Sequence, residues 1–261
     1  MNYNYHTHTF RCNHAKGTPE EYIQRAIENG IEYMGFSEHF PYICRDGFEA
    51  RYRLPVAQLK EYFEELYLLR EKYADKINIK IGFELEYYPE FFDEMLKNAI
   101  SYGAEYLILG QHFLNEEHPD GVYAMTPSDS EDNLKKYADR VIAGIRSGVF
   151  TYIAHPDLFN YTGEEALFRR EMRRICEASA EYNIPLEINF LGIRGNRNYP
   201  NNIFWEIAGE EGCPVTFGFD AHDTLSAYDS GSMEKANNLV EKYNLNYIGM
   251  PKLILLKEEK E

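Results

Sequence analysis

The amino-acid sequence predicts an α/β fold, with seven strand–helix units arranged as a TIM-like barrel. Short apolar segments typical of buried strands alternate with longer amphipathic segments typical of helices along the 261 residues. Histidine and carboxylate side chains follow nearly every strand segment. A barrel gathers the carboxyl ends of all its parallel strands at one mouth, whereas a doubly wound sheet gathers ligands only at its switch point. The second observation therefore favours the barrel over the open sheet.

Seven strands are predicted from short apolar runs. The third has the clearest pattern, because Ile77, Ile79 and Ile81 alternate with polar residues and so share one buried face. In chain order the predicted strands span residues 2–6, 32–37, 77–84, 105–110, 149–154, 185–190 and 214–219. The apolar run at 253–256 is a candidate for a further, closing strand.

The helices are predicted from the amphipathic segments between these strands. The first is the best marked, because Thr18-Pro19-Glu20-Glu21 forms a capping box with proline in the first helical position, and Gly30 ends the helix. The others are expected at about 56–73, 90–102, 131–147, 165–182, 201–211 and 232–243. Residues 113–130 are rich in Glu, Pro, Asp and Ser and are expected to form a loop insertion or lid. No linker or shift in composition divides the chain, so we expect a single barrel domain over residues 1–261.

The composition narrows the class of protein. A net charge of −16 argues against a general nucleic-acid binder, which would need Lys and Arg to neutralise phosphates, but it allows a local basic pocket for a small phosphorylated metabolite. The four cysteines show no close spacing, and the chain has neither a signal-like segment nor an apolar stretch of membrane-spanning length. We therefore expect a cytoplasmic protein with reduced thiols and no nucleic-acid or membrane partner. The oligomeric state is not indicated.

Seven of the eight histidines lie where a strand segment gives way to a loop. They are His6, His8, His14, His39, His112, His155 and His222. The eighth, His118, falls in the acidic loop and is expected to be exposed to solvent. So many imidazoles at one kind of position indicate metal binding, although each one alone could be an ordinary core or surface histidine without a ligand.

Three motifs strengthen the metal interpretation. His6 and His8 are two residues apart on a strand and so point in the same direction, and Asp220 and His222 repeat this arrangement after the seventh strand. Glu84 emerges from the apolar third strand; Glu86 shares its face, so Glu84 is chosen by position alone. The candidate ligands are His6, His8, His14, His39, Glu84, His112, His155, Asp220 and His222. Nine donors exceed one coordination sphere, so two or three divalent metal ions are expected.

These motifs resemble the PHP-domain (polymerase and histidinol phosphatase) family of metallophosphoesterases over essentially the whole chain. The resemblance lies in the order H-x-H, loop His, S-E-H, G-x-E, G-x-H, A-H-P-D and D-A-H. The segments HTHTFRCNH, SEHFP and LEINFLGIR look most like the histidinol-phosphatase branch. The family fold, the PHP fold, is a distorted (β/α)7 TIM-like barrel, in agreement with the fold predicted above.

Carried over position by position, the resemblance implies a trinuclear site. One metal would take His6, His8, Glu84 and Asp220; a second would take His14, His39 and His222; a third would take His112 and His155, with Glu84 bridging to the first. The family uses zinc, iron or manganese, and a mixture of imidazole and carboxylate ligands suits all three. Cys12 lies near these histidines and is read as a free thiol rather than a ligand.

Residues beyond the ligands are predicted to handle the phosphate and the proton. The resemblance points to Arg194 as a phosphate contact, and Arg197 and Arg11 are further candidates, with an ordinary loop arginine as the alternative. Some relatives carry an arginine shortly after the His-Pro-Asp motif, where this chain has Leu158-Phe159-Asn160-Tyr161. Asp220 and His222 are candidate catalytic groups. Asp157 is a candidate orienting residue or proton carrier, or alternatively a helix-capping residue.

The resemblance implies a histidinol-phosphatase of histidine biosynthesis, in which a metal-bridged hydroxide attacks the phosphorus of L-histidinol phosphate to produce L-histidinol and inorganic phosphate. Two alternatives stay open. The chain could be a PHP phosphoesterase for nucleotides, DNA ends or phosphotyrosine, or a metal-binding PHP module without catalysis. The second is disfavoured because no ligand position is replaced.

Overall fold

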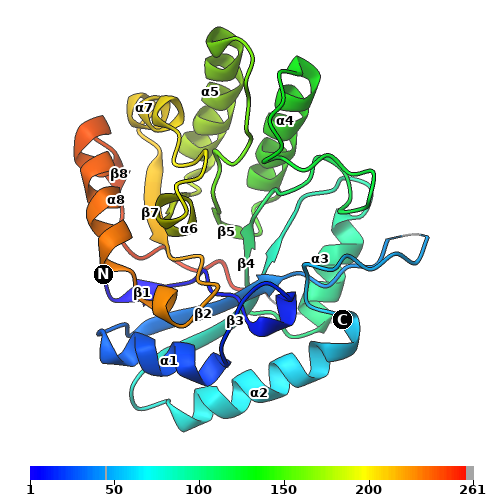
Figure 1. Ribbon diagram of the computed structural model, residues 1–261, viewed down its shortest axis with the longest axis vertical. Helices are drawn as coiled ribbons and strands as arrows, with labels where there is room; N and C mark the ends of the chain where they lie inside the picture. The colour runs from blue at the N-terminus through cyan, green and yellow to red at the C-terminus, as the bar shows by residue number, and fades with distance from the viewer. Residues whose placement is uncertain (45, 257–261) are drawn as a thin grey trace.

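One curved sheet of eight parallel strands runs through the computed structural model, which describes residues 1–44 and 46–256 (Figure 1). The strands are β1 Tyr3–Asn4, β2 Tyr33–His39, β3 Asn78–Leu85, β4 Tyr106–Leu109, β5 Phe150–Ile153, β6 Leu186–Asn189, β7 Pro214–Gly218 and β8 Asn246–Tyr247. Each strand pairs in parallel with the next strand in the chain. This order, without the reversal of a doubly wound sheet, confirms the barrel prediction.

The barrel closes between the first and seventh units at its mouth. Thr7 forms a parallel bridge with Ala221, and the amide of His8 donates to the Ala221 carbonyl at 3.0 Å. Lower down, the Tyr3 hydroxyl bonds to Thr216 Oγ1 at 2.9 Å. The two-residue strand β8 pairs with the start of β7. The closure therefore rests on one bridge and side-chain contacts, which makes a distorted barrel.

Helices cover the outside of the sheet (Figure 1). They are α1 Pro19–Glu28, α2 Leu59–Lys72, α3 Phe92–Ser101, α4 Glu131–Ser147, α5 Glu165–Tyr182, α6 Phe190–Arg194, α7 Asn202–Glu210 and α8 Ser230–Tyr243, with short 3-10 turns η1 Phe10–Cys12, η2 Val56–Gln58 and η3 Leu225–Ala227. The predicted capping box is present, because the Thr18 side chain accepts from the Glu21 amide and the Glu21 carboxylate accepts from the Thr18 amide at 2.6 Å.

One local prediction was wrong, and one short helix was not predicted. The run 253–256 is not a strand: Ile254 donates to Thr151 Oγ1 and Leu256 to the Glu105 carbonyl, so this segment crosses the starts of β4 and β5 instead of pairing along one edge. The sixth strand ends at Asn189, whose side chain accepts from the Gly192 amide at 3.1 Å and caps the unpredicted helix α6.

The interior of the barrel below the mouth is filled by tyrosines. Tyr3, Tyr5, Tyr106 and Tyr152 form a buried cluster with Ile108 and Ala154. Tyr106 packs against the backbone of Gly35. A Cβ at this position would lie 2.1 Å from the Tyr106 hydroxyl oxygen, so only glycine leaves room for the tyrosine ring. This plug fills the lower barrel and leaves its mouth to polar residues.

Residues 113–130 contain no helix or regular strand. An antiparallel bridge between Phe113 and Tyr123 and the burial of Leu114 and Ala124 tie the segment to the body of the protein. His118 is partly exposed and contacts Asp46 and Asp120. Among the described residues, none of the helices has the length and apolar composition needed to span a bilayer.

Candidate metal centre and substrate pocket

The ends of the barrel strands bring all nine predicted metal ligands together at the mouth. Four overlapping groups of donor atoms, each within 4.8 Å of one another, contain them. The groups are His6–His8–Glu84, His6–His155–Asp220, His39–Glu84–His112 and His14–His39–His222. We call these nine residues the donor cluster.

Glu84 lies at the centre of the donor cluster. Its Oε2 is 3.6 Å from His6 Nε2, 3.5 Å from His8 Nε2 and 3.0 Å from His39 Nδ1. Its Oε1 is 2.8 Å from His155 Nε2 and 3.5 Å from His112 Nε2. One carboxylate thus faces five imidazoles, which is the position expected of a bridging ligand.

Asp220 faces two of these imidazoles, those of His6 and His8, and also the ring of His222. Its Oδ1 lies 3.6 Å from His6 Nε2, 3.4 Å from His8 Nε2 and 3.1 Å from His222 Nδ1. Both Asp220 and His155 have positive φ angles, 47° and 31°, so the chain turns sharply as it leaves β7 and β5. These turns aim the side chains into the mouth rather than along the sheet.

Several buried atoms of the donor cluster have no hydrogen-bond partner among the described residues. They are His6 Nε2, His8 Nε2, Glu84 Oε2, His155 Nδ1 and Asp220 Oδ1. An unpaired buried polar atom is costly, and in native proteins such an atom calls for a partner such as an ion. Imidazole nitrogens and carboxylate oxygens are donors that divalent transition metals prefer. The residues therefore fit bound metal ions.

The outer part of the cluster is made of imidazoles that are neutral near pH 7. Desolvation and the neighbouring His222 lower the pKa of His14 to about 4. Burial and the nearby His8 also lower the pKa values of His39 and His222. The Nε2 atoms of His14 and His222 are 2.9 Å apart. Neutral imidazoles with convergent nitrogens are the form that binds metal.

Three carboxylates to which the sequence analysis gave no such role orient the inner imidazoles. Glu187 contacts His6 Nδ1 at 2.8 Å, Glu38 contacts His8 Nδ1 at 3.2 Å, and Glu86 contacts His112 Nδ1 at 3.3 Å. Such contacts leave the other ring nitrogen directed at a metal. The strand alternation in Leu186-Glu187-Ile188-Asn189 was an available signal for Glu187.

These carboxylates also change the acidity of the rings. Burial opposes the charged form of His8, but Asp220 and Glu38 outweigh it and raise its pKa to about 9. Burial likewise opposes the charge on His6, and Glu187, Asp220 and Glu84 raise its pKa well above the usual value. The carboxylates therefore attract cations to the inner site, and a bound metal ion would displace the protons from these two rings.

Asp157 is turned toward α7. Its Oδ2 accepts from the Asn201 amide at 2.6 Å and from Trp205 Nε1 at 3.0 Å. Burial raises its pKa to about 7. These contacts fit the helix-capping alternative better than the role of proton carrier.

A cavity of about 460 Å³ opens above the donor cluster. Its remaining lining residues are Tyr52, Phe113, Glu117, Tyr123, Met125, Leu158, Leu191, Arg197 and Tyr199. Four of these, Phe113, Glu117, Tyr123 and Met125, come from the segment 113–130, which thus forms one wall of the pocket. A pocket that combines a donor cluster with apolar walls suits a small organic ester.

Of the three predicted phosphate-binding arginines, Arg197 lines this pocket, with its Nη1 3.0 Å from the Tyr199 hydroxyl. Arg194 does not line it: its Nη1 donates to the Phe219 carbonyl at 2.6 Å and its Nη2 to the Asp220 carbonyl. Arg194 therefore holds the backbone that carries Asp220. Arg11 lies 2.7 Å from Glu65 of α2, away from the pocket lining. Neither Arg194 nor Arg11 is among the residues that line the pocket, so Arg197 is the better placed of the three for a phosphate, and the phosphate-binding role of all three stays a prediction.

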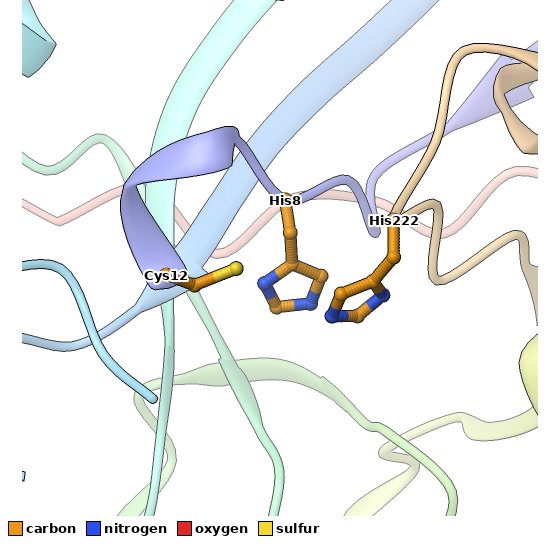
Figure 2. Close-up of side chains that lie close together, drawn as sticks. All are labelled: His8, Cys12 and His222. Atoms are coloured by element: carbon orange, nitrogen blue, oxygen red, sulfur yellow. The ribbon is translucent and has the colours of Figure 1, made fainter. Parts of the chain in front are cut away.

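Cys12 lies beside the donor cluster but carries a neutral thiol. Figure 2 shows its sulfur directed toward His8, with the ring of His222 beyond. The thiol donates to the Thr9 carbonyl at 3.1 Å, and burial, with Glu38 nearby, raises its pKa. Metals bind the thiolate, so these contacts favour the reading of Cys12 as a free thiol.

The fold and the mouth together define a class: a parallel barrel protein with donors for more than one metal ion at the carboxyl ends of its strands. The family model described as the PHP domain matches residues 4–190. The chain therefore belongs to the PHP domain family.

Named relatives and a solved structure resemble the chain over most of its length. A probable histidinol-phosphatase of Schizosaccharomyces pombe is 35% identical over 83% of this chain and 79% of its own. A probable histidinol-phosphatase of Deinococcus radiodurans is 28% identical, covering 83% of this chain and 85% of the relative. The histidinol phosphate phosphatase of Lactococcus lactis, solved with zinc, L-histidinol and phosphate, superposes with a TM-score of 0.74 at 22% identity, over 98% of this chain and 99% of the other. This last likeness supports the fold.

Proposed function

We propose that the chain is a metal-dependent phosphomonoesterase that hydrolyses L-histidinol phosphate to L-histidinol and inorganic phosphate. One observation carries the proposal: Glu84, His155 and Asp220, which each carry an unpaired buried atom, line the same cavity as Arg197. The substrate is supported by the relatives that are named histidinol-phosphatase.

The donor cluster would hold two or three ions of zinc, iron or manganese. His6, His8, Glu84 and Asp220 would hold one, His14, His39 and His222 another, and His112, His155 and Glu84 a third. When bound, such cations lower the pKa of a coordinated water and neutralise phosphoryl oxygens, which supplies a nucleophile near neutral pH.

The chain's own groups would bind the phosphate and manage the proton. Arg197, held by Tyr199, offers its guanidinium to the phosphoryl oxygens. Burial opposes ionisation of Asp220, but His6 and His222 hold its pKa well below the usual value, so it is a carboxylate near neutral pH that can accept a hydrogen bond from the attacking water. His222, whose Nδ1 lies 3.1 Å from Asp220 Oδ1, or Asp220 itself would pass the proton of the water to the leaving alkoxide oxygen.

The remaining parts of the proposal concern organisation. Residues 1–261 would act as one barrel domain, with 113–130 closing one side of the substrate pocket. Asp157 would position α7 through Trp205. The four free cysteines agree with a reducing, cytoplasmic location for an enzyme of amino-acid biosynthesis.

A panel of phosphate esters tests the function. Phosphate release is measured from L-histidinol phosphate, a nucleoside monophosphate, phosphotyrosine and p-nitrophenyl phosphate. We expect the highest kcat/KM for L-histidinol phosphate. Equal rates for L-histidinol phosphate and p-nitrophenyl phosphate would remove the substrate assignment, and preference for another ester would replace it.

A further inference from the structure

The pocket carries one carboxylate that the donor cluster does not use. Among the described residues lining the cavity, the carboxylates are Glu84, Asp220 and Glu117. Glu84 and Asp220 face the imidazoles at the base of the mouth. Glu117 stands on the wall formed by 113–130, with its side chain 15% exposed. Its negative charge therefore faces the substrate space rather than the metal site.

One oxygen of Glu117 is fixed and the other is free. Arg53, almost fully buried, donates from Nε to Glu117 Oε2 at 2.6 Å. Within the described part of the chain, no hydrogen bond holds Glu117 Oε1. A carboxylate that is held through one oxygen has a fixed position, and its other oxygen can still accept a hydrogen bond from a ligand.

Arg53 does not neutralise this charge. Its two terminal nitrogens form a bidentate pair with Glu86, donating to Oε2 at 2.8 Å and to Oε1 at 2.5 Å. One guanidinium thus stands between two carboxylates, of which Glu86 also contacts His112 Nδ1 at 3.3 Å, whereas Arg53 is the one hydrogen-bond partner of the Glu117 carboxylate among the described residues. A cationic ligand would complete the charge balance.

The surroundings of Glu117 suit an organic ammonium group. Tyr52, Phe113 and Tyr123 line the same cavity. Their aromatic faces attract cations and can also stack on a flat ring of a ligand. Arg197, the one non-histidine cation among the described lining residues, provides the opposite charge for a phosphate. The pocket therefore has complementary groups for a zwitterion that carries a phosphate and an amine.

We propose that Glu117 binds the primary ammonium group of the substrate and sets a preference for phosphate esters of amino alcohols. The inference rests on the proposed function and extends it by assigning the amine subsite. Near neutral pH the amine, rather than the imidazole, is the predominantly charged nitrogen of histidinol, which favours it as the partner of a carboxylate.

The test compares two substrates within each protein. kcat/KM is measured for L-histidinol phosphate and for the analogue in which hydrogen replaces the amino group. The ratio of the two values cancels differences in folding and metal loading. In Glu117→Gln we expect this ratio to fall by about 10- to 100-fold, the usual effect of losing a charge-assisted hydrogen bond. Glu117→Asp, which keeps the charge but shortens the side chain, should give an intermediate ratio.

Glu116→Gln is the matched control, because Glu116 bonds to Tyr42 and lines a separate hollow beside Asp46 and Asp120. Its ratio should equal that of the wild type. An unchanged ratio in Glu117→Gln would overturn the inference, as would an equal fall in Glu116→Gln.

Failure of the proposed function would look different. In that case the wild type hydrolyses L-histidinol phosphate no faster than p-nitrophenyl phosphate. The amine subsite is then tested with L-phenylalaninol phosphate and 3-phenylpropyl phosphate, which differ only in the amino group that the second ester lacks. If the wild type prefers the ester that carries the amine, and Glu117→Gln abolishes this preference, the subsite is supported. If the wild type shows no such preference with the histidinol pair or with the phenylalaninol pair, the subsite is overturned.

Discussion

Replacing Glu187 by glutamine should weaken metal binding although Glu187 is not itself a proposed ligand. Its Oε1 contacts His6 Nδ1 at 2.8 Å, while Oε2 accepts from the His155 amide at 3.1 Å and from Asn189 Nδ2 at 2.8 Å. In Glu187→Gln the amide oxygen is retained by these two donors, so the new NH2 group faces His6 Nδ1. His6 must then accept at Nδ1 and carry its proton on Nε2, the atom that points into the donor cluster.

The magnitude follows from the loss of one correctly oriented ligand. Replacing such a supporting carboxylate costs about 10- to 100-fold in metal affinity, or about 1.4 to 2.7 kcal/mol. The assay is a competition titration of zinc against a chromophoric chelator, with Glu181→Gln on the exposed end of α5 as the control. Wild-type zinc affinity in Glu187→Gln, with the fold retained, would refute the assigned orientation of His6.

Three further predictions test other parts of the site. Arg197→Ala should lower kcat/KM for L-histidinol phosphate by about 10- to 100-fold through a lost charge-assisted phosphate contact; unchanged kinetics would exclude that contact. Gly110→Ala should lower metal content measured by elemental analysis, because the new Cβ would lie 1.8 Å from Glu84 Oε1, whereas Gly231→Ala on α8, with its nearest contact at 3.8 Å, should not. Trp205→Phe should lower the free energy of unfolding in urea by about 1–3 kcal/mol, since buried Asp157 loses a donor; full stability would show that α7 is anchored otherwise.

The donor cluster could be predicted because its geometry follows from strand periodicity. His6 and His8 flank Thr7, which bridges to Ala221, and Asp220 and His222 flank Ala221, although the positive φ of Asp220 departs from strand geometry. The common mouth follows from parallel strands in a barrel. Glu187 was equally predictable, because it lies within the run Leu186-Glu187-Ile188-Asn189 that strand alternation already described.

The arginines could not be predicted in the same way, because their direction depends on the loop that carries them. Arg194 ends the short helix α6, and Arg197 follows Asn196, which has a positive φ of 47°. Arg194 and Arg197 are three residues apart, yet the guanidinium of Arg194 bonds to the Asp220 carbonyl whereas Arg197 lines the pocket. Strand periodicity does not apply to such residues.

Short and irregular elements could not be predicted from the periodicity of apolar residues either. β8 has two residues, too few to show alternation. Leu253 is apolar because it packs against the tyrosines inside the barrel, not because it belongs to a strand. Glu117 carried no signal, since its partner Arg53 lies 64 positions earlier in the chain.

Metal titration of the chelated protein tests the central claim most directly. Phosphate release from L-histidinol phosphate is followed while zinc or manganese is added back to metal-free protein. The account predicts no activity without metal and a rise that saturates at about two or three equivalents per chain, the number that the nine donors can serve. Full activity in the metal-free protein, or no activity at any metal content, would contradict it.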